Sequence, residues 1–418
     1  MSRSEILRHR PLRALLFAEV ISTTGAQMTW LALPWFVLTT TGSAGRMTVV
    51  ILAESIGLAA AGLPAGAFVE RFGAKRSMLF ADAVRAPLML FVPILHWSGH
   101  LTMPALLVLA FLLGALAGPY FTAQRVIMPE LLGEDEATIS QANALFQGAI
   151  RTTLLLGPPL GGVLIGVIGA ANVLVVDAAT YLVSFALVAL FVPTREPVPK
   201  DDQEATASRG VLAGLKFLVR EPLLRVWIPL FVLGDAAWQS FFVAVPVLTV
   251  ERFGADAKIA GALFAGFGAG ALIGNFLSFR YLAQRIDGLR LIAFSVPLQA
   301  APLWLLTLHL PARAMFGAIL LSGIGNGICN PTIHSLFTLR MPVAVRAKAM
   351  AAATVIWGLG TPLGLLFAGP VLATLGPQPV LVGFALVQTV CMLGVSVACL
   401  RARAAGISSP APAGSPSP

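Results

Sequence analysis

Apolar stretches separated by short polar or glycine-containing breaks recur along almost the whole chain. Each stretch holds about 20 residues or more, which is enough for a helix to cross the hydrocarbon core of a bilayer. The pattern predicts twelve such helices, at residues 12–38, 46–69, 77–97, 103–126, 138–167, 171–192, 224–250, 257–279, 288–308, 313–338, 347–373 and 378–400. We therefore expect an all-α membrane protein with twelve transmembrane helices.

The longest polar break, residues 193–223, divides these helices six plus six. It predicts an N-terminal bundle at 1–192, a cytoplasmic linker at 193–223, a C-terminal bundle at 224–400 and a disordered tail at 401–418. The later part of the linker, V-L-A-G-L-K-F-L-V-R, is apolar and basic, which is typical of an amphipathic helix on a membrane surface.

Two segments in the two halves resemble each other. Residues 26–35 (A-Q-M-T-W-L-A-L-P-W) match residues 238–247 (W-Q-S-F-F-V-A-V-P-V), with Gln27 aligned to Gln239 and Pro34 to Pro246, 212 positions apart. Residues 156–162 (L-G-P-P-L-G-G) similarly match residues 359–365 (L-G-T-P-L-G-L) at an offset of 203. A membrane protein built from two similar halves is typically a transporter whose site lies between the halves.

The composition indicates a membrane protein. The net charge of +9 does not indicate nucleic-acid binding, because its distribution along the chain follows the membrane topology. The chain is 57% hydrophobic and 11% charged, whereas about 25% charge is usual in soluble domains. Most of the 28 Lys and Arg residues fall in loops on the side of the N-terminus, so the positive-inside rule places both termini in the cytoplasm. No P-loop, metal-ligand spacing or nucleophile elbow is present, so we expect no cofactor, no metal and no enzyme.

A sequence motif between the second and third predicted helices carries a family resemblance. Residues 66–76, G-A-F-V-E-R-F-G-A-K-R, resemble the signature of the major facilitator superfamily at the matching loop. Gly66 is expected to allow close helix packing, Glu70 to face a neighbouring helix N-terminus, and the basic residues to hold the loop inside. The resemblance implies two pseudo-symmetric six-helix bundles and a conformational switch, whose motif residues are Gly66, Glu70, Arg71, Gly73, Lys75, Arg76, Asp82 and Arg85.

Further segments narrow the resemblance to the drug:proton antiporter branch that holds macrolide efflux proteins and the enterobactin exporter. They are L-P-W at 33–35, T-G-S at 41–43, the Asp82–Arg85 pair, Gln124–Arg125, D-A-A-T-Y-L-V-S at 177–184 and G-L-K-F at 214–217. The segment Gly157, Pro158, Gly161 and Gly162 resembles the antiporter motif of exporters, although Thr153 replaces its upstream glycine. Plain helix packing explains these small residues equally well.

Polar residues recur at intervals of four in three predicted helices, so each set lies on one helix face. The resemblance implies that helices 1, 4, 7 and 10 line a central cavity, and these sets fall on helices 1, 7 and 10. Hydrogen bonding inside each bundle is the alternative. The three faces comprise Glu19, Thr23 and Gln27; Asp235 and Gln239; and Asn326, Asn330 and His334.

Ionisable residues inside a membrane are costly and are functional candidates by default. The hypothesis is that Asp235 or Glu19 carries a coupling proton or pairs with a cationic substrate, with Glu54 and His334 as further proton-coupling candidates. Arg125 is either a positive-inside anchor or a residue of the substrate cavity that attracts anionic substrates, and Arg151 is a secondary candidate at the edge of the cavity. Asp82 and Arg85, three residues apart on one helix, are expected to pair directly and to join Glu70 in a cytoplasmic charge cluster.

Aromatic residues on helices 1 and 7 are candidates for stacking on a bulky substrate, or for anchoring at the membrane interface. They include Trp30, Trp238 and Phe242. The sequence as a whole predicts a proton-coupled exporter of drugs, macrolide-like compounds or siderophores in the cell inner membrane. It is expected to act as a monomer, with a small-molecule substrate, protons and lipids as partners. An importer or lysophospholipid-type lipid transporter of the same fold, and a non-transporting membrane receptor, are the alternatives.

Overall fold

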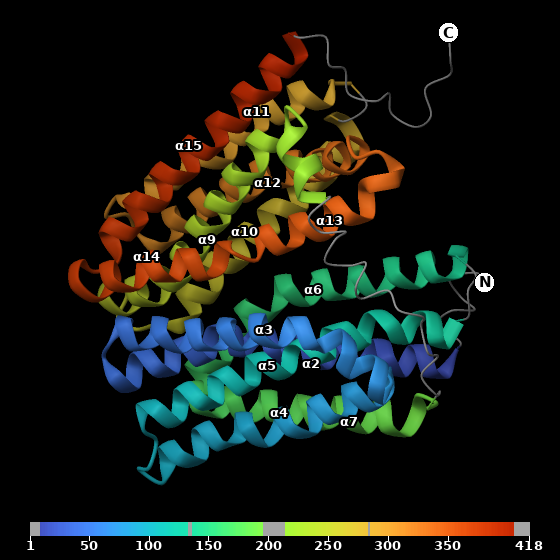
Figure 1. Ribbon diagram of the computed structural model, residues 1–418. Helices are drawn as coiled ribbons and strands as arrows, with labels where there is room; N and C mark the ends of the chain where they lie inside the picture. Colours follow the sequence, from blue (N-terminus) through green and yellow to red (C-terminus); the bar gives the residue numbers. More distant parts are fainter. Residues whose placement is uncertain (1–8, 133–135, 195–213, 283–284, 405–418) are drawn as a thin grey trace. The chain divides into compact units, whose positions relative to one another are not determined.

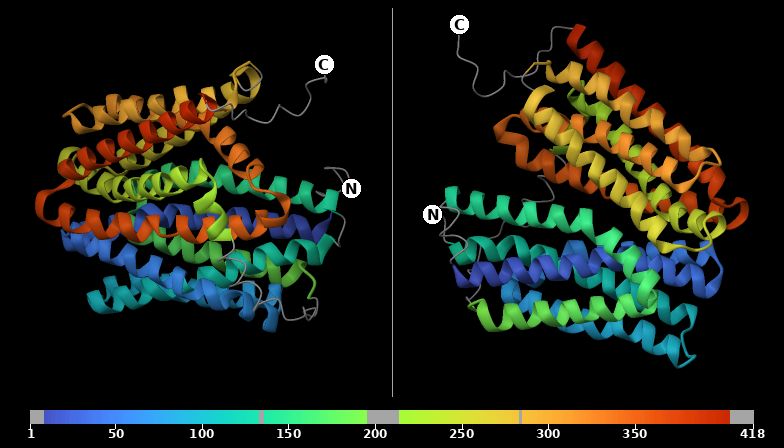
Figure 2. Two further views of the ribbon diagram at one scale, coloured as in Figure 1. Left: turned by 45° about the horizontal axis from the view of Figure 1, so that its top comes forward. Right: turned by 180° about the vertical axis from the view of Figure 1, so that it is seen from behind.

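The computed structural model describes residues 9–132, 136–194, 214–282 and 285–404, and every regular element in these ranges is helical (Figure 1). The chain forms two compact units. Unit 1 comprises Met1–Lys200 with Gly254–Ala262, and unit 2 comprises Asp201–Phe253 with Leu263–Pro418. Long helices lie side by side within each unit, which is clearest from the views in Figure 2.

Unit 1 contains six long helices joined by short turns. Gly42 ends the first helix with a φ of +61° and donates its N–H to the carbonyl of Leu38, and Ser43 caps the next helix by accepting from the N–H of Arg46. The T-G-S segment is therefore a C-cap followed by an N-cap. The helices are α2 (Arg10–Thr41), α3 (Ala44–Phe72), α4 (Ala74–Trp97), α5 (Met103–Leu132), α6 (Glu136–Ile168) and α7 (Ala170–Phe191).

Unit 2 begins, in the described residues, with a short helical stretch at 214–220, and the remainder of the predicted linker at 195–213 lies outside the described residues, as does 405–418 of the predicted tail. Its long helices follow in chain order. They are α9 (Leu224–Arg252), α10 (Ala257–Leu277) with a π-helical turn at Ser278–Leu282, α11 (Gly288–Ala300) with a 3₁₀ helix at Ala301–Thr307, α12 (Ala312–Leu339), α13 (Val343–Trp357), α14 (Gly360–Leu375) and α15 (Pro377–Ala404). The first residues of α10, up to Ala262, are counted with unit 1.

The two units use corresponding helices in the same way. In unit 1, α2 packs against α6 and α7. In unit 2, α9 packs against α14 and α15. The first helix of each half therefore lies against the fifth and sixth, as the internal sequence match predicts.

Helices occupy all twelve predicted ranges, but the prediction of one continuous helix at 347–373 was wrong. The helix breaks after Trp357 and restarts at Gly360, so α13 and α14 are separate. Two glycines, Gly358 and Gly360, flank Leu359 at the break, and glycine is a poor helix former. Ten of the described helices are long and apolar enough to cross a membrane by length and composition, and α14 is a shorter apolar helix.

Polar and apolar residues are distributed in the reverse of the usual soluble pattern. Glu19, Asp82 and Asp177 are 0–1% exposed, whereas Phe279 and Leu190 are 80% and 76% exposed. Charged residues are almost never fully buried in soluble proteins unless they are paired. This distribution fits helices whose outer faces contact lipid and whose polar groups face the unit interior.

Glycines allow helix backbones to cross closely in both units. A Cβ built on Gly57 of α3 would lie 2.0 Å from the carbonyl oxygen of Phe111 in α5, and one on Gly114 of α5 would lie 1.9 Å from that of Glu54. Gly274 in α10 approaches the carbonyl of Ile324 in α12 in the same way, at 2.1 Å. Such close contact between small residues is a common source of helix association in membranes.

Candidate functional site

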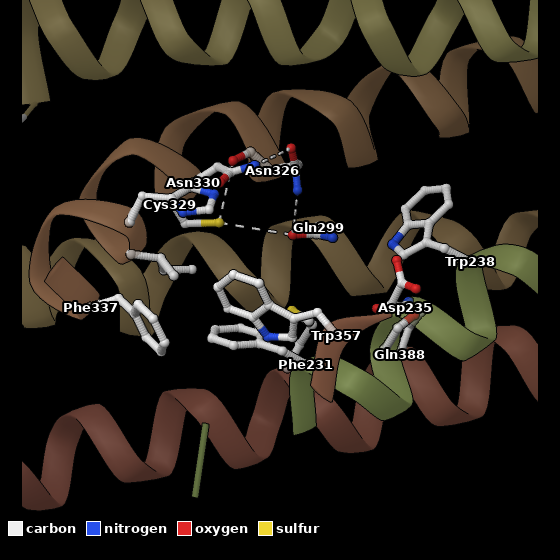
Figure 3. Close-up of a pocket in the computed structure, with 14 residues that line it drawn as sticks. Phe231, Asp235, Trp238, Gln299, Asn326, Cys329, Asn330, Phe337, Trp357 and Gln388 are labelled. Atoms are coloured by element: carbon white, nitrogen blue, oxygen red, sulfur yellow. Dashed lines mark hydrogen bonds between the residues drawn. The ribbon is translucent and has the colours of Figure 1, made fainter. Parts of the chain in front are cut away.

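A cavity of about 350 Å³ lies inside unit 2, and we call it the unit 2 cavity. Helices α9, α11, α12, α13 and α15 each contribute to its wall (Figure 3). Figure 3 shows Asp235 and Gln388 toward one end, Asn326 and Asn330 toward the other, and Trp357 with Phe231 between them. The fourteen described residues that line it are Phe231, Gly234, Asp235, Trp238, Gln299, Asn326, Cys329, Asn330, Ile333, His334, Phe337, Trp357, Gln388 and Met392.

Asp235 lies on α9 beside the start of α14. A Cβ built on Gly360 would lie 2.3 Å from Oδ2 of Asp235, so any larger residue at 360 would displace the carboxylate. Gly360 is the first residue of α14, and the N-terminus of a helix favours a nearby negative charge. The break between α13 and α14 therefore creates the space and part of the electrostatic environment for this carboxylate.

Gln388 of α15 is fixed next to Asp235. Its Nε2 donates to the carbonyl of Gly234 at 2.7 Å, which determines the orientation of the amide. Its Oε1 is buried and has no hydrogen-bond partner among the described residues, and the side chain is 0% exposed. A buried acceptor without a partner is uncommon, so this oxygen needs an explanation.

Three amides form a chain at the other end of the unit 2 cavity. Nδ2 of Asn330 donates to Oδ1 of Asn326, and Nδ2 of Asn326 donates to Oε1 of Gln299, both at 3.5 Å. The Sγ of Cys329 also lies 3.9 Å from Oε1 of Gln299. The amide of Gln299 therefore has partners for its oxygen, in contrast to Gln388.

Aromatic rings form the apolar walls of the unit 2 cavity. The ring of Trp238 contacts those of Phe267 and Phe384, with centroids 4.4 and 5.0 Å apart. Trp357 packs on Phe337 at 5.2 Å, and its indole Nε1 is buried without a partner among the described residues. Small-molecule sites are typically apolar clefts with a few polar groups in fixed positions, and this arrangement has those features.

Five of the residues singled out from the sequence line this one cavity. Asp235 and Trp238 come from α9, and Asn326, Asn330 and His334 come from α12. Gln239 and Phe242 do not line it: Gln239 interacts with the carboxylate of Asp235, and Phe242 packs on Trp238 at 5.8 Å. The sequence reasoning missed Gln299, Gln388 and Trp357. A glutamine in the middle of each of two apolar stretches was the available signal for the first two.

Unit 1 holds a buried cluster of ionisable groups, which we call the unit 1 cluster: Glu19, Asp82, Arg85, Tyr120, Asp177 and Tyr181. Both oxygens of Glu19 have partners, because Oε1 accepts from Thr23 at 2.9 Å and Oε2 accepts from the hydroxyl of Tyr120 at 3.1 Å. Thr23, predicted for the cavity, is therefore engaged with Glu19.

Arg85 occupies the centre of the unit 1 cluster. Its Nη2 donates to the hydroxyl of Tyr181 at 2.7 Å, and its guanidinium lies over the Tyr181 ring, 4.2 Å from the centroid. The expected direct pair with Asp82 was wrong, since no salt bridge joins the two among the described residues. Glu70 is exposed, and it too forms no salt bridge in the described part of the chain, so the proposed charge cluster with this residue does not form.

The remaining candidates of unit 1 occupy different environments. Gln27 of α2 contacts α6, because a Cβ on Gly157 would lie 2.2 Å from its Cβ. Trp30 is 39% exposed, Arg125 is exposed and Glu54 is half-buried on α3. The side chain of Arg151 lies outside the described residues.

The motif between α3 and α4 acts partly as expected. The prediction that Gly66 permits close packing was wrong, because a Cβ there meets no described atom within 4 Å. Gly73 is required for the turn between the helices, with a φ of +83°. Lys75 donates from Nζ to the carbonyl of Ala189 at 3.1 Å, near the C-terminus of α7, while Arg71 and Arg76 are exposed.

The segment with glycines at 157, 161 and 162 packs closely within its unit. A Cβ on Gly161 would lie 3.0 Å from the carbonyl of Met28, next to the approach of Gly157 to α2. Pro158 lies inside α6, and Gly162 is buried. These contacts favour the packing interpretation of the segment.

Comparisons with known proteins agree with this fold. The multidrug efflux pump Tap of Mycolicibacterium fortuitum is 26% identical over 383 residues, which cover 86% of this chain and 88% of that protein. The enterobactin exporter EntS of Citrobacter koseri is 25% identical over 320 residues, covering 73% and 74%. The crystal structure of the nucleoside transporter NupG has a TM-score of 0.73 at 12% identity and covers 93% of this chain and 98% of NupG, which shows the fold alone.

The family model described as Major Facilitator Superfamily matches residues 15–365 and, in a second match, residues 235–416. The two matches together cover most of the chain. The resemblance predicted from the motifs, including that to the drug efflux branch, is confirmed by this model and by the two relatives. The chain belongs to the Major Facilitator Superfamily and is a membrane transporter of its fold.

Proposed function

We propose that this transporter is a proton-coupled exporter of bulky amphipathic small molecules that works by alternating access. Drugs, macrolide-like compounds and siderophores are its substrate classes. The similarity to an efflux pump and to a siderophore exporter supports this direction and these classes. The protein acts as a monomer in the cell inner membrane, with both termini in the cytoplasm, as the distribution of Lys and Arg predicts.

The unit 2 cavity is the observation that carries the proposal. It combines one carboxylate, several amides and aromatic walls in about 350 Å³, a volume within the range of small-molecule sites. An amphipathic compound would place its apolar part against Phe231, Phe337 and Trp357 and its polar part against Asp235 or the amides. Intramembrane carboxylates are the groups that usually mark proton and substrate pathways.

Asp235 is a better coupling residue than Glu19 on geometric grounds. Glu19 is 1% exposed, and both of its oxygens are hydrogen-bonded inside unit 1. Asp235 is half-buried and lines an open cavity, where a proton and a substrate can reach it. We therefore assign proton coupling to Asp235 and a structural role to Glu19.

Transport by the purified protein in liposomes tests the proposal. A pH gradient drives uptake into the liposomes of an amphipathic drug that carries a primary or secondary amine, compared with ethidium, erythromycin and enterobactin, and a trapped pH dye follows the protons. Asp235→Asn should lower the pH-driven flux about tenfold or more, while Glu19→Gln should lower it less. Asp256→Asn, which changes an exposed carboxylate outside the cavity, is the matched control and should leave the flux unchanged.

The outcomes separate the alternatives. Full proton-coupled flux in both Asp235→Asn and Glu19→Gln would overturn the coupling assignment. The absence of any flux in the reconstituted wild type, with folded protein and ligand binding intact, would favour a receptor. In whole cells, loss of an exporter raises the intracellular substrate concentration, whereas loss of an importer lowers it.

A further inference from the structure

We infer that the unit 2 cavity selects a primary or secondary ammonium group, which donates one N–H to Asp235 and a second N–H to Oε1 of Gln388. This inference rests on the proposed function, because it narrows the substrates of the same cavity, within the classes proposed above, to compounds that carry a primary or secondary amine. It assigns a specificity-determining role to Gln388, which is a fully buried polar residue in the largely apolar sequence of α15.

The charged residues that line the unit 2 cavity favour a positively charged ligand. Asp235 is the only carboxylate among the fourteen described residues that line it, and this set contains no lysine or arginine. His334 is the other group there that can change charge near neutral pH, and it comes from α12 rather than from the helices that hold Asp235 and Gln388. The electrostatic field near Asp235 therefore favours a cation.

Gln388 adds a second hydrogen-bond acceptor beside the carboxylate of Asp235. Oε1 of Gln388 has no partner among the described residues, although it is completely buried. The amide cannot turn its nitrogen toward the cavity without losing the bond from Nε2 to the carbonyl of Gly234. Asp235 and Gln388 therefore place two acceptors at one end of the cavity. Gln239 interacts with the carboxylate, but the amide oxygen of Gln388 has no donor among the described residues, and a bound ligand can supply one.

The side chains of Asp235 and Gln388 lie close together. Gly234, to which Gln388 is bonded, directly precedes Asp235, and a Cβ on Gly234 would lie 3.9 Å from Oε1 of Gln388. Figure 3 shows Asp235 and Gln388 next to each other, with Trp238 beyond Asp235. In the inferred complex one ligand nitrogen donates to both oxygens, and the indole of Trp238 adds a cation–π contact.

This arrangement makes a specific prediction about methylated amines. A primary or secondary ammonium has at least two N–H groups and satisfies both acceptors. A tertiary ammonium has one N–H and leaves Oε1 of Gln388 without a partner, which is the costly situation in a buried site. A quaternary ammonium keeps the charge and the cation–π contact but donates to neither oxygen.

A series of four amphipathic amines tests the inference by direct binding. The probes are 4-phenylbutylamine and its N-methyl, N,N-dimethyl and N,N,N-trimethyl derivatives, with N-acetyl-4-phenylbutylamine as the neutral reference. Calorimetry on the purified full-length protein in detergent gives the Kd values at a pH where all four amines are charged. In the wild type, the affinity should fall about tenfold between the secondary and the tertiary amine, because a hydrogen bond from a charged donor is lost.

Two variants locate the effect. Gln388→Met removes the second acceptor at similar size. The tenfold fall in affinity should then lie between the tertiary and the quaternary amine instead of between the secondary and the tertiary amine. Gln378→Met, on the same helix but outside the cavity, removes an amide whose oxygen already accepts from Arg252, so the fall in affinity should stay between the secondary and the tertiary amine. If Gln388→Met does not fold, the four wild-type affinities still test the inference.

Three results would overturn the inference: equal affinity for the secondary and tertiary amines in the wild type, preference for the quaternary or the neutral compound, or an unchanged step in folded Gln388→Met. Failure of the proposed function is a separate outcome. In that case the liposomes show no proton-coupled flux, although the amines bind with the expected step. Proton-coupled flux of a substrate without preference for N–H-bearing cations would contradict this inference alone.

Discussion

Units 1 and 2 share a helix arrangement but treat their intramembrane polar groups in opposite ways. Unit 1 gathers ionisable groups into a buried cluster in which Glu19 is bonded to Thr23 and Tyr120, and Arg85 is bonded to Tyr181. Unit 2 arranges one carboxylate and several amides around a cavity of about 350 Å³. We infer that the bonded cluster makes unit 1 the more rigid half, and that unit 2 provides the polar groups available for binding a ligand in its cavity.

The contrast can be followed at aligned positions. Thr23 and Asp235 correspond at the offset of 212, but Thr23 donates to a carboxylate of its own helix, whereas Asp235 is itself the carboxylate and lies against Gly360. Gly157 and Gly360 correspond at the offset of 203, and each makes a close approach to the first helix of its unit. Both halves therefore keep a glycine that lies close to their first helix, but the side chain that the glycine approaches is Gln27 in unit 1 and Asp235 in unit 2.

The largest expected effect that tests this comparison comes from Arg85→Met. The substitution removes the cation from the neighbourhood of Glu19, Asp82 and Asp177, and leaving buried charges uncompensated costs about 3–5 kcal/mol. Asp235→Asn is the matched change in unit 2, and it should cost less than about 1 kcal/mol because Asp235 is half-buried beside an open cavity. Reversible unfolding in mixed detergent micelles, followed by tryptophan fluorescence, gives both free energies of unfolding.

Equal loss of stability in the two variants would contradict the comparison. It would mean that Asp235 is as firmly integrated in unit 2 as Arg85 is in unit 1. Loss of stability in Asp235→Asn alone would reverse the roles that we give to the two units.

The sequence predicted the main features of the fold because each of them depends on local patterns. Twelve apolar stretches gave twelve helical regions, and the polar residues four apart in α12 (Asn326, Asn330 and His334) all line the unit 2 cavity. The break after Trp357 was not predicted, since Gly358 and Gly360 lie in a stretch whose hydropathy is that of an uninterrupted helix.

The sequence could not predict which helices contribute single polar residues to the cavity. Gln388 has no polar residue three or four positions away on its helix, and Gln299 has only Ser295. Their role therefore depends on how α11 and α15 are rotated against α9 and α12. The same limit applies to the unit 1 cluster. Spacing on one helix suggested an Asp82–Arg85 pair, but Tyr181 from α7 lies closer to the guanidinium and accepts its hydrogen bond.

A second, smaller effect compares a closely packed glycine of unit 2 with an unpacked glycine of unit 1. A Cβ on Gly364 would lie 2.2 Å from the carbonyl oxygen of Ala236 and 2.8 Å from Cβ of Gln239, so Gly364→Ala forces α14 away from α9. Overpacking of this kind costs about 1–3 kcal/mol. Gly66→Ala should instead raise the stability slightly, by about 0.5–1 kcal/mol, since its Cβ meets no described atom and alanine favours a helix.

Melting temperatures in one detergent, compared with the wild type, measure both glycine variants. The expected result is a fall for Gly364→Ala and a small rise for Gly66→Ala. A fall of similar size in both would show that Gly66 is closely packed in the intact transporter, as its motif first suggested.

The smallest expected effect concerns the end of a unit 1 helix. Lys75 donates to the carbonyl of Ala189 in the last turn of α7, where carbonyls lack partners within the helix and a cation is favoured. Lys75→Met should therefore cost about 0.3–1 kcal/mol and accelerate amide exchange locally near residues 188–191. Arg76→Met is the matched control, because Arg76 is exposed and most exposed substitutions stay within about 0.5 kcal/mol. If exchange also accelerates around Asp235, the two units are not independent in stability, and unit 1 cannot be treated as a rigid half that leaves the unit 2 cavity unaffected.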